Sequence, residues 1–185
     1  MKISRCMNKQ RRWKILLKCA IAFSLGVIWM TPAVAALPEA SLAAVRNGIP
    51  GIAERYVGMP YAFGADPEHH GAADNSHLIC AIYGEAARNA GFAFPGYMPM
   101  KMLLARTIRI HPDMVEPGDL MVLKDGHAAM IYHVEDAENF DLIYASLKRG
   151  KVVAFNSRNL VYEVYWRVHL DGFYRFDPTL SAPVD

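Results

Sequence analysis

The residues of this chain whose types and spacing could do chemistry are Asp74-Asn75-Ser76-His77, with a cysteine close behind at position 80. A polar cluster directly before an apolar periodic run is typical of a helix N-terminus. Free backbone N–H groups and the helix dipole favour an anion or a thiolate at such a position. The cluster could therefore hold a nucleophile or only cap a helix, and the residue at its centre is an asparagine.

The helix that must position this cluster is predicted over residues 76–90. Its apolar residues fall mostly at steps of three and four, and Gly91 is placed to end it. A shorter helix is expected over residues 99–106. Upstream, residues 38–57 carry a helical pattern that we expect to break at Asn47-Gly48.

In this reading, Pro50 starts a second short helix that ends at Gly58. The segment that follows, residues 59–71, is rich in Gly and Pro and is predicted to be a loop without regular structure. This loop leads directly into the Asp74 cluster, so its conformation should shape any site there.

After residue 106 the chain changes to short segments that are rich in β-branched and aromatic residues and separated by turns. Strands are predicted over residues 107–110, 119–124, 127–134, 140–146, 152–156, 160–168 and 173–176. Helices followed by strands predict an α+β domain, with N-terminal helices packed on an antiparallel β-sheet.

The first 35 residues have the pattern of a secretory signal peptide. Seven Lys and Arg without an acidic residue precede a charge-free, largely apolar run from Cys19 to Met30, and Pro32 to Ala36 supply small residues for cleavage. An apolar helix of about twelve residues spans about 18 Å, short of the roughly 30 Å hydrocarbon core, so an uncleaved anchor is the less favoured alternative. We expect an exported protein, in the periplasm or the extracellular cell envelope, with no stable membrane span after cleavage.

Loss of this leader changes the charge of the chain. The whole sequence has 20 Lys and Arg and 18 Asp and Glu; without the seven leader cations, 13 remain against 18, a net charge of −5. No basic patch or aromatic-basic pattern indicates a nucleic-acid partner. Cys6 and Cys19 leave with the leader, so Cys80 remains alone and no intramolecular disulfide can form.

Several motifs, in this order along the chain, resemble the NlpC/P60 group of papain-like cell-wall peptide hydrolases. They are YVGMPYAFGA from Tyr56, DNSHLI from Asp74, VEPGDLMVL from Val115, GHAAMIY from Gly126 and IYAS from Ile143. The resemblance implies a papain-like fold. It also implies a domain plan of signal peptide (1–35), helical lead-in (36–49), NlpC/P60-like domain (50–177) and C-terminal tail (178–185).

The resemblance also implies the residues of a groove. The family's helix start reads Asp-Cys-Ser-Gly or Asp-Cys-Ser-His, so Asp74, Ser76 and His77 match it, while Asn75 stands in the place of the catalytic cysteine. With Tyr61 of the preceding loop, the three matching residues would line the groove that binds the substrate. The substrate class implied is a peptidoglycan stem peptide or a related peptide.

Two further catalytic positions follow from the same resemblance. His127 matches the family's catalytic histidine, and Tyr144 stands at the position of the third, orienting residue. In papain-like chemistry a thiolate attacks a peptide carbonyl while the histidine accepts and returns the proton. An asparagine amide is not nucleophilic at neutral pH, so His127 has nothing to activate at position 75.

Two other side chains are candidates for the nucleophile. Cys80 lies five residues further along the helix, which turns its side chain by roughly 140° and moves it about 7.5 Å along the axis. We therefore expect Cys80 to be a buried core thiol. Ser76 could form a hydroxyl-imidazole pair with His127, although a capping hydroxyl is the commoner role at a helix start.

Three functions follow. The favoured one is a catalytically degenerate protein that binds a wall peptide in the former active-site groove. The alternatives are an active endopeptidase or amidase that uses Ser76 or Cys80 with His127, and a non-enzymatic regulator or scaffold of a cell-wall hydrolase. A free groove at the helix start would favour either of the first two, and an occluded one the third. His69 and His70 match no zinc signature, so no metal site and no cofactor is predicted.

Overall fold

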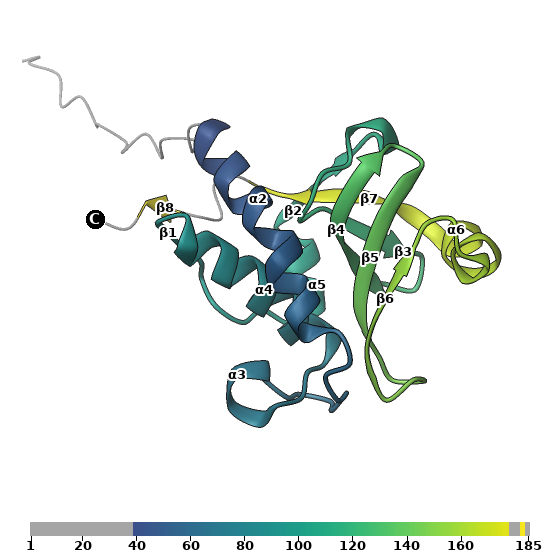
Figure 1. Cartoon of the computed structure of the whole chain (residues 1–185), viewed down its shortest axis with the longest axis horizontal. Helices are drawn as coiled ribbons and strands as arrows, with labels where there is room; N and C mark the ends of the chain where they lie inside the picture. Colours follow the sequence, from purple (N-terminus) through teal and green to yellow (C-terminus); the bar gives the residue numbers. More distant parts are fainter. Residues whose placement is uncertain (1–38, 178–181, 184–185) are drawn as a thin grey trace, which may run out of the picture. The chain divides into compact units, whose positions relative to one another are not determined.

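The computed structural model of the chain describes residues 39–177 and 182–183. The predicted signal peptide and most of the predicted tail lie outside these residues. The described residues belong to the unit Ala35–Asp185, which has an α+β fold (Figure 1). Its helices are α2 (Glu39–Tyr56), α3 (Pro67–His70), α4 (Asn75–Asn89), α5 (Met100–Leu104) and α6 (Arg167–His169), with short turns η1 (Pro112–Met114) and η2 (Tyr162–Trp166).

The break predicted at Asn47-Gly48 is wrong, because α2 is one continuous helix that contains Pro50. A proline inside a helix costs about 3 kcal/mol and a glycine about 1. Burial of several aliphatic side chains, each worth about 1.5–3 kcal/mol, outweighs this cost. A Cβ on Gly48 would lie 3.8 Å from the Cβ of Ala86, an ordinary van der Waals contact, so α2 and α4 pack against each other at this position. The buried face of α2 consists of Val45, Ile49, Ile52 and Ala53.

The main sheet has six strands in the order β2-β7-β3-β4-β5-β6, and all neighbouring pairs are antiparallel. Six of the seven predicted strands are present, with ends shifted by up to three residues. Their bounds are β2 (Thr107–Ile110), β3 (Leu120–Leu123), β4 (Ala128–Asp136), β5 (Asn139–Ser146), β6 (Lys151–Asn156) and β7 (Leu170–Phe176).

The two faces of this sheet pack against different elements. Alternate residues of β5 show the division: Ile143 and Ala145 join the core under α2 and α4, while Leu142 and Tyr144 join a second core that contains Trp166. Figure 1 shows α2 and α4 beside one part of the sheet and α6 beyond another. The sheet is therefore covered by helices from both ends of the sequence.

The strand predicted over residues 160–168 is wrong. These residues form a helical segment, Leu160 to His169, with a π-helical turn at η2. Asn159 accepts a hydrogen bond from the N–H of Val161 and so starts the segment. Tyr162 and Trp166, four residues apart, are buried on the same face. A β-branched and aromatic composition predicted a strand, but this spacing of four gives a helix a buried face.

The loop before α4 is more regular than predicted. Residues Pro67–His70 form the one-turn helix α3, where irregular structure was expected. Asp66 accepts a hydrogen bond from the N–H of Glu68, Pro67 takes the first helical position, and Gly71 ends the turn with φ of 60°. These are the ordinary start and stop signals of a helix, on the scale of a single turn.

The helix predicted over residues 76–90 is confirmed as α4. Leu78, Ile79 and Ile82 are fully buried beneath it, and Asp74 caps its N-terminus. At the opposite end, β1 (Phe92–Ala93) follows the helix and pairs with β8 (Ala182–Pro183). The cluster that could do chemistry is thus at the end of α4 far from β1.

Candidate functional site

Asp74 joins the loop before α4 to the start of the helix. Its Oδ1 accepts hydrogen bonds of 2.9 Å from the N–H of His77 and from the hydroxyl of Ser76, and its Oδ2 accepts one of 2.9 Å from the N–H of Gly64. Gly64 has φ of +72°, a conformation that favours glycine and allows its N–H to meet the carboxylate. Asp74 itself is only 7% exposed. Asp74 therefore fixes the conformation of the loop and the helix start together.

These contacts also determine the ionisation of Asp74. Burial alone would raise the pKa of this carboxyl, but the hydrogen bonds from His77, Ser76 and Gly64 stabilise the charged form and lower its pKa below the usual value. The ring Nδ1 of His77 lies 3.0 Å from Oδ1, close enough for an ion pair although not aligned as a hydrogen bond. Asp74 and Ser76 are thus engaged with each other and with the backbone.

Asn75 bridges the helix to the sheet. Its Nδ2 donates a hydrogen bond of 2.5 Å to the carbonyl oxygen of Ala128 at the start of β4, and its Oδ1 accepts one of 3.0 Å from the N–H of Ala145 in β5. Both ends of the amide thus bind strand backbone, which leaves one N–H of Nδ2 and one lone pair of Oδ1 for a ligand.

His127 lies on the turn between β3 and β4, and its side chain is 73% exposed. Its ring Nδ1 lies 3.1 Å from Oδ2 of Asp125, whose Oδ1 accepts a hydrogen bond of 3.0 Å from the His127 N–H. The hydrogen bond from this N–H is the main cause that lowers the pKa of Asp125, so the carboxylate is ionised at neutral pH. Since Nδ1 faces Asp125, Nε2 is the ring nitrogen that a ligand could engage.

The residues at the start of α4 and those of the 125–127 turn line one groove of about 240 Å³. It brings together three of the four residues predicted for the groove and two predicted for catalysis, but it does not include His77, Tyr144 or Cys80. The sequence interpretation missed Asp125, Gly126, Phe63 and Met100, although the Asp-Gly-His turn was a signal for the first two. The lining residues are Tyr61, Phe63, Asp74, Asn75, Ser76, Met100, Asp125, Gly126 and His127.

Tyr61 reaches this groove because its loop is held along the edge of the sheet. The Tyr61 N–H donates to the carbonyl of Gly150 at 2.9 Å, and a parallel bridge joins Tyr61 to Ala73. Phe63, two residues further, is 91% exposed. The ring therefore does not belong to the core, and it lies at the rim of the groove where a ligand could contact it.

Tyr144 lies on the other face of the sheet. Its ring packs edge-on against Phe155 at 5.8 Å and against Trp166 at 5.0 Å between centroids, and it borders a separate hollow. Successive side chains of a strand point to opposite faces, and the neighbouring residue Ala145 is the one whose backbone meets Asn75. The structure therefore does not bring Tyr144 to the groove, and the carboxylate that contacts the histidine ring is that of Asp125.

Cys80 is a core residue, as the helical geometry predicted. It is 6% exposed, accepts a hydrogen bond from the N–H of Met98 at 3.4 Å, and its pKa is raised to about 11, chiefly by burial. A thiol with this pKa is almost entirely protonated at neutral pH and a poor nucleophile. His77 stacks its ring on Tyr97 at 3.7 Å, outside the groove.

The loop histidines do not gather into a metal site. His69 pairs with Asp66 at 3.0 Å, and the ring Nδ1 of His70 accepts a hydrogen bond from the Asp66 N–H. Among residues 39–177 and 182–183, no group of three or more His, Cys, Asp or Glu side chains is arranged to hold a metal ion. Over the same residues, no helix is long and apolar enough to cross a membrane.

Comparison with known proteins identifies the fold. No protein-family model and no curated protein matches the sequence. Among solved structures, the chain is similar to a protein of Staphylococcus aureus subsp. aureus Mu50 described as similar to lipoprotein, NLP/P60 family. The two are 20% identical with a TM-score of 0.50, and the match covers 76% of this chain and 42% of that one.

The likeness, together with the helices packed on an antiparallel sheet, defines the class of this fold. It is the α+β, papain-like fold of an NLP/P60 domain, as the motif order predicted. This chain spans less than half of the length of the structure it matches.

Proposed function

We propose that this protein binds a peptide in the groove between the start of α4 and the 125–127 turn, and that it does not cleave it. The ligand class is a peptidoglycan stem peptide or a related wall peptide, and the setting is the cell envelope after export. The observation that carries the proposal is the double hydrogen bond of the Asn75 amide to Ala128 and Ala145.

In this proposal, the Asn75 amide lies where the nucleophile of a hydrolase would lie, and it cannot act as one. An amide nitrogen has no lone pair available for attack, and a helix N-terminus cannot convert it into one. The neighbouring hydroxyl of Ser76 is buried and donates its hydrogen bond to Asp74 and not to the ring of His127. Cys80 is protonated and lies outside the groove. None of the three candidate nucleophiles is therefore placed to attack a carbonyl.

The groove does have the features that ligand binding requires. The groove is open, which favours a ligand over the scaffold alternative, and it combines the exposed ring of Phe63 with the ionised carboxylate of Asp125 and the ring of His127. Such a mixture of apolar surface and a few polar groups is typical of small-ligand sites. An amino group on the ligand would complement Asp125, and a peptide carbonyl could accept from His127.

The proposal is tested with the chain from residue 36 on, since the unit Ala35–Asp185 contains the whole described core. Purified peptidoglycan is incubated with the protein and fragment release is followed by chromatography, while binding of a soluble stem peptide is measured by calorimetry. We expect binding without release. Phe63→Ala should weaken binding about tenfold, because a buried aromatic contact is lost, whereas the matched exposed variant Met114→Ala should not.

Three results would contradict the proposal. Release of fragments that is abolished by Ser76→Ala, or by alkylation of Cys80, would indicate an active hydrolase with an unusual nucleophile. Binding that Phe63→Ala and His127→Ala leave unchanged would place the ligand elsewhere on the protein. The absence of any peptide binding would favour the regulator or scaffold alternative instead.

A further inference from the structure

The helical segment from Leu160 to His169 carries an apolar stripe that nothing in the described part of the chain covers. Its inner face is buried through Tyr162 and Trp166. Its outer face has apolar residues at positions i, i+1, i+4, i+5 and i+8, the spacing of one side of a helix. These residues, 43 to 73% exposed, are Leu160, Val161, Val164, Tyr165 and Val168.

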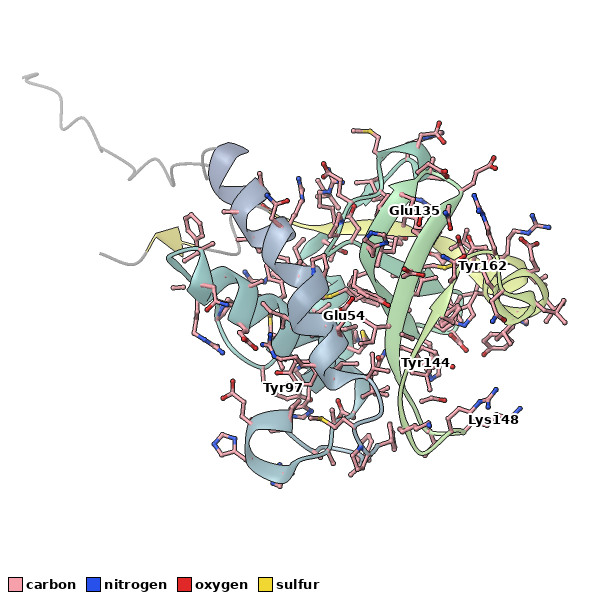
Figure 2. The ribbon with its side chains drawn as sticks, viewed as in Figure 1. Glu54, Tyr97, Glu135, Tyr144, Lys148 and Tyr162 are labelled. Carbon is pink, nitrogen blue, oxygen red and sulfur yellow. The ribbon has the colours of Figure 1, made fainter. Side chains whose placement is uncertain are left out.

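This stripe differs from scattered surface apolar residues. A single exposed leucine or valine on a soluble protein needs no explanation, but a contiguous set marks a contact surface. Leu147, at the turn between β5 and β6, is also 75% exposed. Figure 2 shows Lys148 at this hairpin and Tyr162 on the helical segment.

The residues around the stripe are strongly basic. Between Leu147 and His169 the sequence has five Lys and Arg and one acidic residue, Glu163, whereas the rest of the chain after residue 35 has eight Lys and Arg and 17 Asp and Glu. The region is thus +4 and the remainder −9. Glu163 pairs with Arg167 at 3.0 Å. The exposed cations are Lys148, Arg149, Lys151, Arg158 and Arg167.

A hollow of about 250 Å³ joins the basic hairpin to the apolar stripe. Arg149 and Lys151 border it from the hairpin, and Asn159 and Val161 border it from the start of the helical segment. It lies outside the peptide groove, with which it shares no lining residue. Two cations and an amide beside an apolar strip form a place where an anionic oxygen group can sit while a hydrocarbon chain contacts Val161.

We propose that this surface docks the protein on a membrane that contains anionic phospholipids. An amphipathic helix with an apolar stripe and flanking cations lies in the plane of the interface, and the cations are attracted to the acidic headgroups. Tyr165 has the amphipathic ring that is enriched at this depth. A soluble polyanion would use the cations but not the apolar stripe, so lipid accounts for both. The inference is independent of the peptide groove.

The test uses the chain from residue 36 on, sedimented with vesicles of phosphatidylcholine alone or mixed with phosphatidylglycerol, at about 0.1 M salt. We expect the protein to sediment only with the anionic vesicles. Each Lys or Arg near such a surface is worth about a fivefold change in binding, so Arg149→Glu with Lys151→Glu should reduce it by at least about 25-fold. The matched charge control is Lys101→Glu with Arg106→Glu, on a different part of the surface.

A second pair of variants tests the stripe. Val164→Ser with Val168→Ser should reduce vesicle binding about tenfold, and Ile108→Ser with Met114→Ser, which are equally exposed elsewhere, should not. All four positions are exposed, so melting temperatures should be unchanged.

Three outcomes would overturn the proposal. One is no sedimentation with anionic vesicles. The second is an equal loss of binding in the Lys101 and Arg106 control, which would mean that vesicle binding depends only on the net charge of the protein. The third is a concentration-dependent dimer that Val164→Ser with Val168→Ser dissolves, without vesicle binding, which would make the stripe an interface between two copies of the chain.

Discussion

The two walls of the peptide groove are built in opposite ways. On the α4 wall, Asp74, Asn75 and Ser76 are buried or half-buried, and each side chain forms hydrogen bonds within the protein. On the turn wall, Asp125 and His127 are exposed and bonded mainly to each other. The α4 wall is thus hydrogen-bonded into the fold, while the turn wall leaves Asp125 and His127 in contact with solvent.

This difference fits the proposal of a groove that binds a peptide without cleaving it. The Asn75 amide forms two hydrogen bonds between α4, β4 and β5, so it stabilises the shape of the groove while offering no nucleophile. The histidine across the groove contributes little to stability. It needs another reason to remain, and contact with a ligand is the reason we propose.

The largest expected effect comes from restoring the thiol on the α4 wall. Asn75→Cys should create a thiol that reacts with iodoacetamide about 100-fold faster than Cys80 at neutral pH, because Cys80 is buried and has a pKa of about 11. Mass spectrometry of the alkylated peptides would give both rates in one protein. Adding His127→Ala should slow only position 75; equal rates at both cysteines would mean that the two walls no longer match.

Next in size is the difference between the two acidic residues. Asp74→Ala removes the helix cap and three hydrogen bonds, and should lower the free energy of unfolding by about 3 kcal/mol, whereas Asp125→Ala should change it by less than about 0.5. Urea unfolding at pH 7 measures both. Similar losses in the two variants would remove the distinction between a structural and a solvent-facing wall.

The ionisation of Asp74 should also make the free energy of unfolding depend on pH. The pKa of Asp74 is lower in the folded state than in the unfolded chain, so its contribution is present above about pH 4 and is lost as the pH falls through the folded-state pKa. In Asp74→Ala, stability should therefore fall less steeply below pH 4 than in the wild type. If stability falls equally steeply below pH 4 in both proteins, other carboxyl groups determine acid unfolding.

The smallest expected effect concerns the Asn75 bridge itself. Asn75→Ala should cost about 2 kcal/mol, because the N–H of Ala145 and the carbonyl of Ala128 lose their partner, and His127→Ala should cost less than about 0.5. Asn75→Asp refines this comparison, since its carboxylate can still accept from Ala145 but repels the Ala128 oxygen at pH 7. It should regain stability in acid, and a lack of pH dependence would argue against the Ala128 contact.

Much of the fold could be predicted from local patterns. The helix beginning at the Asp74 cluster and six strands were visible as periodicity and turn residues, and Cys80 was placed in the core by its angle around the helix. The partners of Asn75 could not be predicted in this way, because they lie 53 and 70 residues further along the chain. Only the packing of α4 on the sheet brings them within hydrogen-bond distance.

The errors have equally specific causes. Leu142, Ile143, Tyr144 and Ala145 are all apolar or aromatic, so alternation could not show which face of β5 each residue occupies. The motif alone placed Tyr144 at the third catalytic position. The segment after residue 160 has the composition of a strand and the spacing of a helix. In β5, burial on both faces of the sheet removed the polar positions that would have decided the question. In the helical segment, apolar residues on the exposed face had the same effect.

The short pairing of β1 with β8 has a practical consequence for such experiments. It brings Ala182 and Pro183 to the end of α4 opposite the groove, and a helix of 15 residues separates these two ends by about 22 Å. A linker attached after residue 185 would therefore tether the protein to a sensor chip with the groove facing the solution, so immobilisation at this end should not block a peptide.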